Sequence, residues 1–301
     1  MDRVETERSS SSSRMMGAAE FDVCSTKTGR SYRIYTYAPV DQTVQGRLPV
    51  VYITDGNMLF HAAMMQAVYM TEIGEIEPAL IVGIGYSVTN LGETVARRRF
   101  DLTPCAPEVE QRQGEIRGGE GAQYGGAEAF LTFITDELEP MLDALYKIDA
   151  RNRTIFGHSL GGLFALYSLL RHPAEFRTFV AASPSIWWNG KSILQHLPRF
   201  RHAVEIEQSA PRVLITVGAL EESTERARVI PADMTPELFQ VRIQRRRAVE
   251  NARELSVELR GIQGTAGYHV QFTEFEAETH ASVVGAALSR GLVFALTPKS
   301  S

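Results

Sequence analysis

Residues 153–170 read RTIFGHSLGGLFALYSLL, and the character of the sequence changes in the middle of this stretch. The run TIF at 154–156 predicts a buried strand, whereas the apolar residues from Leu163 onward repeat with helical spacing. Between them lies G-H-S-L-G at 157–161, a serine bracketed by glycines. This pattern predicts a sharp strand-to-helix turn that holds Ser159 in a strained backbone conformation with its hydroxyl exposed.

The predicted turn has the features of a nucleophile site. The helix that follows would begin with unpaired backbone amides and the positive end of its dipole, which stabilise a nearby anion. The alternative for a pattern of five residues is a glycine-rich connection without chemistry. Because a strand precedes the pattern and a long apolar helix follows it, we favour the catalytic interpretation, with Ser159 as the nucleophile.

The composition is that of an ordinary globular protein. The 301 residues are 44% hydrophobic and 22% charged, with a formal net charge of −5 at pH 7. The acidic balance argues against a nucleic-acid partner, and no apolar run approaches the ~18 residues of a membrane span. Residues 1–17 mix charges with a serine run and lack the apolar segment of a secretory signal, so we expect a disordered leader and a cytoplasmic protein. Two cysteines, Cys24 and Cys105, are too few for a disulfide framework.

Strands alternate with helices along the chain. Strand-like runs are EFDVCST, SYRIYTYAP, LPVVYITDG, ALIVGIGY, TIF, FRTFVAASPS, PRVLITVG and YHVQFTEFEAETH, and helical patterns cover roughly 58–70, 126–146, 160–170, 237–259 and the residues after 281. This alternation predicts an α/β fold with a mostly parallel central sheet and helices on both faces. Residues 86–126 and 221–236 suggest no regular structure, and the Gly-rich part at 106–126 is expected to be mobile.

A serine hydroxyl is a poor nucleophile without a base, so a histidine must be close to it. His280 ends FTEFEAETH, in the loop after the last expected strand. Functional groups of α/β sheets gather at the carboxyl ends of the strands, the edge that also carries Ser159. We therefore predict that His280 is the general base, against the alternative of a solvated loop histidine. His158 is expected to face away from the serine hydroxyl.

A carboxylate would orient the imidazole and stabilise its cationic form. Glu221 follows the strand VLITVG and lies between Ser159 and His280 in chain order, as the order serine, acid, histidine requires. We favour Glu221 as this acid. Glu222, Asp233, and a site without a strong acid remain alternatives.

An oxyanion hole needs two backbone donors. One is expected from Leu160, the residue after the nucleophile. The other is expected from Gly56 in TDGN, with Asn57 as a second choice and an ordinary Asp-Gly turn as the competing interpretation. The histidines show no H-E-x-x-H or other clustered ligand spacing, so we expect no metal and no cofactor.

The motifs VVYITDGNMLF, RRRFDLTP, GGAEAFLTFITDELEP, TIFGHSLGGLFALYSLL, SPSIWWNGKSIL, VGALE and AETHASVVGAALSRGL together carry a resemblance. With them the chain resembles the putative-esterase family of α/β-hydrolases, and within it the siderophore esterases that hydrolyse trilactones such as enterobactin and bacillibactin. The matching stretches cover most of residues 30–296 in the same order. Because the sequence shows no internal repeat and no domain boundary, we expect one α/β-hydrolase domain over residues 18–298, with a mobile insert near 106–126.

The resemblance also implies roles for individual residues. It assigns Ser159 as the nucleophile, His280 as the base and Gly56 and Leu160 as oxyanion donors, and it places Glu221 where the acid falls in some members. Residues implied to line the substrate cleft are Arg98, Arg99, Trp187 and Trp188. The alternatives are an ion-paired surface for the arginines and core packing for one of the tryptophans.

The sequence thus predicts a serine carboxylic-ester hydrolase that acts through an acyl-enzyme. Its expected partner is a small-molecule ester or lactone with a bulky, aromatic, siderophore-like acyl part. The alternatives are a thioester or short-acyl hydrolase of the S-formylglutathione hydrolase type and an acyltransferase on the same fold. The sequence does not indicate an oligomeric state.

Overall fold

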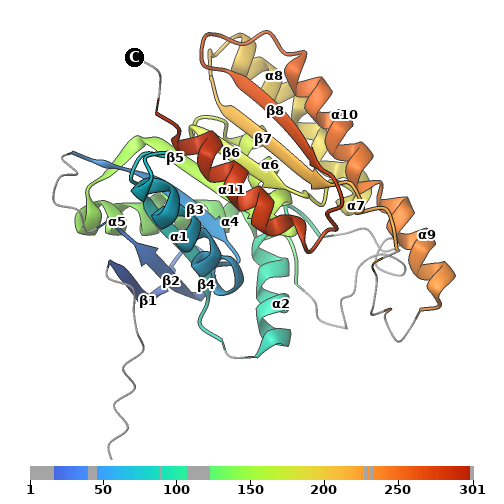
Figure 1. Cartoon of the computed structure of the whole chain (residues 1–301), viewed down its shortest axis with the longest axis horizontal. Coiled ribbons are helices and arrows are strands. Elements are labelled where there is room, and N and C mark those ends of the chain that lie inside the picture. The colour runs from blue at the N-terminus through green and yellow to red at the C-terminus, as the bar shows by residue number, and fades with distance from the viewer. Residues whose placement is uncertain are drawn as a thin grey trace, which may run out of the picture.

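The computed structural model describes residues 17–39, 46–88, 90–106, 123–224, 226, 230 and 234–298 (Figure 1). The expected disordered leader covers residues 1–17, and the expected mobile insert lies near 106–126. Most of both segments, residues 1–16 and 107–122, lies outside the described residues.

The described residues form one eight-stranded sheet in the order β1-β2-β4-β3-β5-β6-β7-β8. The strands β1 and β2 are antiparallel to each other, and β2 is antiparallel to β4, whereas the pairs from β4 through β8 are parallel. This arrangement confirms the mostly parallel sheet. The strands are β1 (Ala18–Cys24), β2 (Ser31–Tyr37), β3 (Leu48–Thr54), β4 (Leu80–Tyr86), β5 (Ile148–His158), β6 (Thr178–Ala182), β7 (Arg212–Gly218) and β8 (His269–Phe275).

Helices cover both faces of the sheet, because the central strands are apolar on both sides. Along β3, Val50 and Tyr52 point into one hydrophobic layer, and Val51 and Ile53 point into the other. The helices α1 (Gly56–Glu72) and α11 (Val283–Leu296) lie side by side over the second layer (Figure 1). The first layer is covered by α4 (Ala127–Thr132), α5 (Glu139–Tyr146), α6 (Leu160–Arg171), α8 (Leu197–Glu205) and α10 (Ala248–Arg260).

Two helical predictions need correction. The expected helix over 237–259 is two helices, α9 (Pro236–Arg246) and α10, because Arg247 between them adopts a left-handed conformation with φ 44°. The Glu222 carboxylate accepts hydrogen bonds from the Val249 and Glu250 amides and so caps the start of α10. The expected helix over 126–146 contains a π-helical segment, Phe133–Leu138, between α4 and α5.

Part of the segment 86–126, for which the sequence suggested no regular structure, is the helix α2 (Leu91–Asp101). The Asn90 side chain accepts a hydrogen bond from the Gly92 amide at 2.7 Å and caps this helix. One turn further on, Glu93 and Arg97 form an i,i+4 ion pair of 2.8 Å. Both signals are visible in the sequence, so this helix could have been predicted.

Among the described residues, no helix is long and apolar enough to cross a membrane. Both cysteines, Cys24 and Cys105, are free thiols.

Candidate active site

The turn between β5 and α6 places Ser159 in a conformation that a non-glycine residue seldom adopts, with φ 60° and ψ −114°. The glycines beside it are required by close packing. A Cβ atom on Gly157 would lie 2.0 Å from the carbonyl oxygen of Gly161, and one on Gly161 would lie 2.3 Å from Thr54 Oγ1. The strand β5 and the helix α6 can therefore meet at Ser159 only with glycine at position 157, and glycine at position 161 lets α6 pack on the end of β3.

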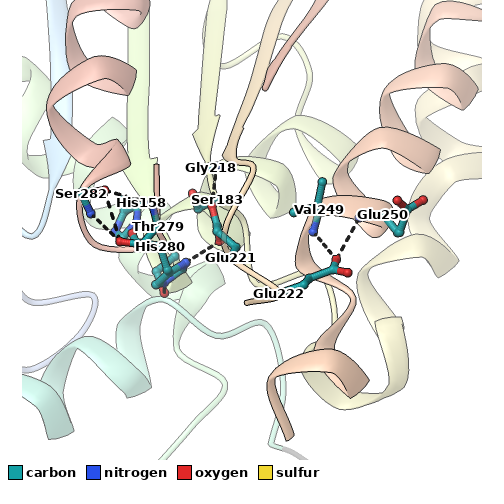
Figure 2. A network of polar contacts seen from close by, with 11 residues as sticks. His158, Ser183, Gly218, Glu221, Glu222, Val249, Glu250, Thr279, His280 and Ser282 are labelled. Atoms are coloured by element: carbon teal, nitrogen blue, oxygen red, sulfur yellow. Dashed lines mark hydrogen bonds and ion pairs between the residues drawn. The ribbon is translucent and has the colours of Figure 1, made fainter. Parts of the chain in front are cut away.

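Three side chains that are distant in the sequence meet at this turn. The Oγ atom of Ser159 is 3.0 Å from Nε2 of His280, and Nδ1 of His280 is 2.7 Å from Oε2 of Glu221. Ser159 follows β5, Glu221 follows β7, and His280 follows β8, so all three come from the carboxyl edge of the sheet. Figure 2 shows the imidazole of His280 directed at the carboxylate of Glu221.

The Glu221 carboxylate is buried, with 7% of the residue exposed. Its Oε1 atom accepts hydrogen bonds from Ser183 Oγ at 2.5 Å and from the Gly218 amide at 2.8 Å (Figure 2). Burial raises the pKa of Glu221, but the hydrogen bond and charge of His280, together with the donors Ser183 and Gly218, outweigh it and hold the pKa below its ordinary value. The carboxylate is therefore ionised at neutral pH.

The two alternative acids have different places. Glu222 is turned toward α10, whose first amides it caps, and its carboxylate points away from His280 (Figure 2). The separation of these neighbours comes from a turn, in which the Glu221 amide donates to the Gly218 carbonyl at 3.2 Å. Asp233 lies outside the described residues.

Two helices begin next to Ser159. Leu160 is the first residue of α6 and Gly56 the first of α1, and these helices follow the neighbouring parallel strands β5 and β3. The first amides of a helix have no partner within the helix and carry the positive end of its dipole. A Cβ atom on Gly56 would lie 2.6 Å from the backbone carbon of Gly83, so the chain there packs directly on β4.

The arginines of α2 differ in their surroundings. Arg98 donates from Nε and Nη2 to the two carboxylate oxygens of Asp55, at 2.7 and 2.8 Å. This pair holds the residue just before Gly56, and it corresponds to the ion-paired alternative for the arginines. The guanidinium of Arg99 lies 5.9 Å from the ring centroid of Tyr124.

The adjacent tryptophans also differ. Trp188 is only 2% exposed and donates its indole N–H to the Cys105 carbonyl at 3.3 Å, which fits the core-packing alternative for one of the pair. Trp187 is partly buried, and the Arg246 guanidinium lies over its ring, 4.2 Å from the ring centroid.

Three contacts around the site were not anticipated from the sequence: Ser183 to Glu221, Asp55 to Arg98, and His158 to the backbone of His280. No local sequence pattern signals them, because each contact joins segments far apart in the chain. Within the described part of the chain, no group of three His, Cys, Asp or Glu side chains could hold a metal ion.

The model of the family described as "Putative esterase" matches residues 25–277 of this chain. The chain belongs to this family. It is an ester hydrolase with the α/β-hydrolase fold. A ferri-bacillibactin esterase of Bacillus subtilis is 34% identical over 273 residues, which span 89% of this chain and 86% of that protein. A siderophore triacetylfusarinine C esterase of Aspergillus fumigatus is 33% identical over 83% of this chain and 82% of that protein.

The solved structure of the siderophore hydrolase EstA from Aspergillus nidulans superimposes on this esterase with a TM-score of 0.79 and 30% sequence identity. The alignment covers 92% of this chain and 93% of that one. In contrast, an S-formylglutathione hydrolase of Mus musculus is 26% identical over only 32% of this chain and 40% of that protein.

The packing around Ser159 predicts opposite effects for two glycine substitutions. Gly157→Ala places a methyl group 2.0 Å from the Gly161 carbonyl oxygen, a backbone atom, and should cost about 3 kcal/mol or more of unfolding free energy together with most esterase activity. Gly285→Ala, in α11, meets no atom within 4 Å and should leave activity unchanged and stability equal or up to ~1 kcal/mol higher. Thermal unfolding and ester hydrolysis of both variants measure this, and an active, stable Gly157→Ala protein would contradict the packing argument.

Proposed function

We propose that this esterase is a serine hydrolase in which Ser159 forms an acyl-enzyme, with His280 as general base and Glu221 as the acid that orients it. The observation that carries the proposal is the continuous pair of short contacts from Ser159 Oγ to His280 Nε2 at 3.0 Å and from His280 Nδ1 to Glu221 Oε2 at 2.7 Å. The ionised Glu221 can only accept, so Nδ1 of His280 carries the proton and Nε2 is free to accept one from Ser159.

The contacts support a conventional acyl-transfer sequence. His280 takes the hydroxyl proton as Ser159 Oγ bonds to the ester carbonyl carbon, and the carbonyl oxygen becomes an oxyanion. The backbone amides of Gly56 and Leu160 are the proposed donors to this oxyanion. The imidazolium of His280, stabilised by Glu221, then protonates the leaving alkoxide, and water activated by the same imidazole releases the acid.

The substrate class that the site supports is an ester or lactone with an aromatic, oxygen-rich acyl part. Ser185, whose amide donates to the Ser159 carbonyl at 3.1 Å, begins the segment that carries the two tryptophans. Rings and guanidinium groups continue from it in a row of contacts: Arg246 over Trp187, Trp187 on Trp188, Trp188 on Tyr124, and Tyr124 under Arg99. Trp188 is buried and supports the row from within, so Trp187, Tyr124 and the two guanidinium groups are the parts that would meet an aryl group with anionic oxygens. The similar proteins that are named as siderophore esterases support the same substrate class.

The alternatives receive less support. The partial match to S-formylglutathione hydrolases covers about a third of the chain, which weakens a thioester or short-acyl activity as the main function. An acyltransferase would use the same serine and histidine and would differ in accepting an alcohol instead of water.

A substrate comparison separates these activities. Catechol trilactones and aryl esters should be hydrolysed with kcat/KM at least about 100-fold higher than S-formylglutathione, because the aromatic and cationic side chains of this row would add binding that a short acyl group cannot use. The measurement is steady-state hydrolysis across the panel, with and without added alcohol. A preference for the thioester, or product found mainly as a new ester, would instead favour the corresponding alternative.

Neutralising the two adjacent glutamates should have unequal effects. Glu221→Gln removes the charge that stabilises the imidazolium and should lower kcat by up to about 10⁴-fold. Glu222→Gln keeps an oxygen that can accept hydrogen bonds from the Val249 and Glu250 amides, so kcat should be unchanged. The free energy of unfolding should fall by no more than ~1 kcal/mol. Steady-state kinetics of both variants decide the matter. A mild loss in both would indicate a serine–histidine dyad, and a larger loss in Glu222→Gln would move the acid by one residue.

A further inference from the structure

The second histidine of the site, His158, has a definite partner. It is the last residue of β5 and precedes Ser159 in the turn, and its side chain reaches the loop that carries His280. Its Nε2 atom lies 2.8 Å from the backbone carbonyl oxygen of His280, and the two imidazole rings have centroids 4.7 Å apart (Figure 2).

The chemistry of this contact fixes the tautomer of His158. A carbonyl oxygen can only accept, so Nε2 of His158 must carry the proton and donate it. Burial, followed by the charge of His280, lowers the pKa of His158 to about 4 and outweighs the opposing influence of Glu221, Asp55 and the His280 carbonyl. His158 therefore stays neutral when the imidazole of His280 becomes positively charged.

The turn thus holds His280 at two points through consecutive residues. Ser159 contacts the imidazole at 3.0 Å, and His158 contacts the backbone of the same residue at 2.8 Å. The remainder of the loop is tied elsewhere: the Leu220 amide donates to the Glu278 carbonyl at 2.9 Å, and Arg226 donates to the Ala277 carbonyl at 2.7 Å. Among the described residues, His158 is therefore the side chain that forms a hydrogen bond with the backbone of His280 itself.

We propose that His158 is a positioning residue for the reaction, which clamps the backbone of His280 at a fixed distance from Ser159. The proposal deepens the proposed function and rests on it, because a clamp on His280 affects turnover only if His280 is the base. Displacement of a reacting group by about 1 Å can cost on the order of 100-fold in rate, so a clamp on the base should be visible in kcat.

The test compares two replacements of His158, one that lacks a side-chain hydrogen-bond donor and one that keeps a donor. His158→Phe keeps a ring and removes the N–H, whereas His158→Gln keeps an amide N–H that can reach the His280 carbonyl. We expect His158→Phe to lower kcat by about 10- to 100-fold with KM changed less than about threefold. His158→Gln should recover most of the lost kcat. His202→Phe, an exposed position on α8, is the matched control and should resemble the unmodified protein.

Labelling of Ser159 by a fluorophosphonate separates the His158 clamp from the serine mechanism on which it rests. The labelling reaction depends on the serine and its base and needs little else of the substrate site. Slow labelling of His158→Phe, with thermal unfolding near that of His158→Gln, supports the clamp. If both variants keep the labelling rate and the kcat of the unmodified protein, the clamp is overturned while the serine mechanism stays intact. Equal loss in both variants also overturns it, since the donor would then be irrelevant. Absence of labelling at Ser159 in the unmodified protein would instead refute the proposed function.

Discussion

The structure depends on the conformation of one residue, Ser159, whose positive φ of 60° turns the chain from β5 into α6. This conformation is held from several sides: the Ser159 amide donates to the Ala182 carbonyl at 3.0 Å, and the Ser159 carbonyl accepts from Ser185 at 3.1 Å. Glycine at position 157 lets β5 and the start of α6 approach closely at this turn, and glycine at position 161 lets the start of α6 pack against Thr54 of β3. The strain is located where the proposed nucleophile is presented, and the surrounding backbone over-determines it.

The parallel sheet then brings the remaining groups to the same edge. Gly56 follows β3, Ser183 follows β6, Glu221 follows β7, and His280 follows β8, so each lies just beyond the carboxyl end of a strand in the run β3-β5-β6-β7-β8. Parallel strands make this convergence a property of the topology, because all their carboxyl ends point the same way. The buried Glu221 shows what the arrangement provides. Two donors from two different strand ends fill one carboxylate oxygen and leave the other for the imidazole.

Much of this arrangement could be predicted from the sequence, and the reasons are physical. Apolar runs of β-branched residues and helical repeats indicated the mostly parallel sheet with helices on both faces. The chain order of Ser159, Glu221 and His280, each just beyond a strand end, indicated three residues that the structure does bring together. The break at Arg247 was missed because an arginine carries no signal for a left-handed conformation, and the cap that Glu222 supplies to α10 comes from 27 residues earlier in the chain. The contacts of Ser183 with Glu221 and of Asp55 with Arg98 span 38 and 43 residues, and no local pattern encodes such pairs.

The central claim is that ester hydrolysis passes through a covalent intermediate on Ser159, and the most direct test is to capture that intermediate. The protein is mixed with a p-nitrophenyl ester, quenched in acid on the millisecond timescale, digested and analysed by mass spectrometry. The account predicts a burst of nitrophenol close to one equivalent per site and an acyl group on Ser159, with neither in Ser159→Ala. Turnover in Ser159→Ala near that of the unmodified protein, or an acyl group on another residue, would contradict the account.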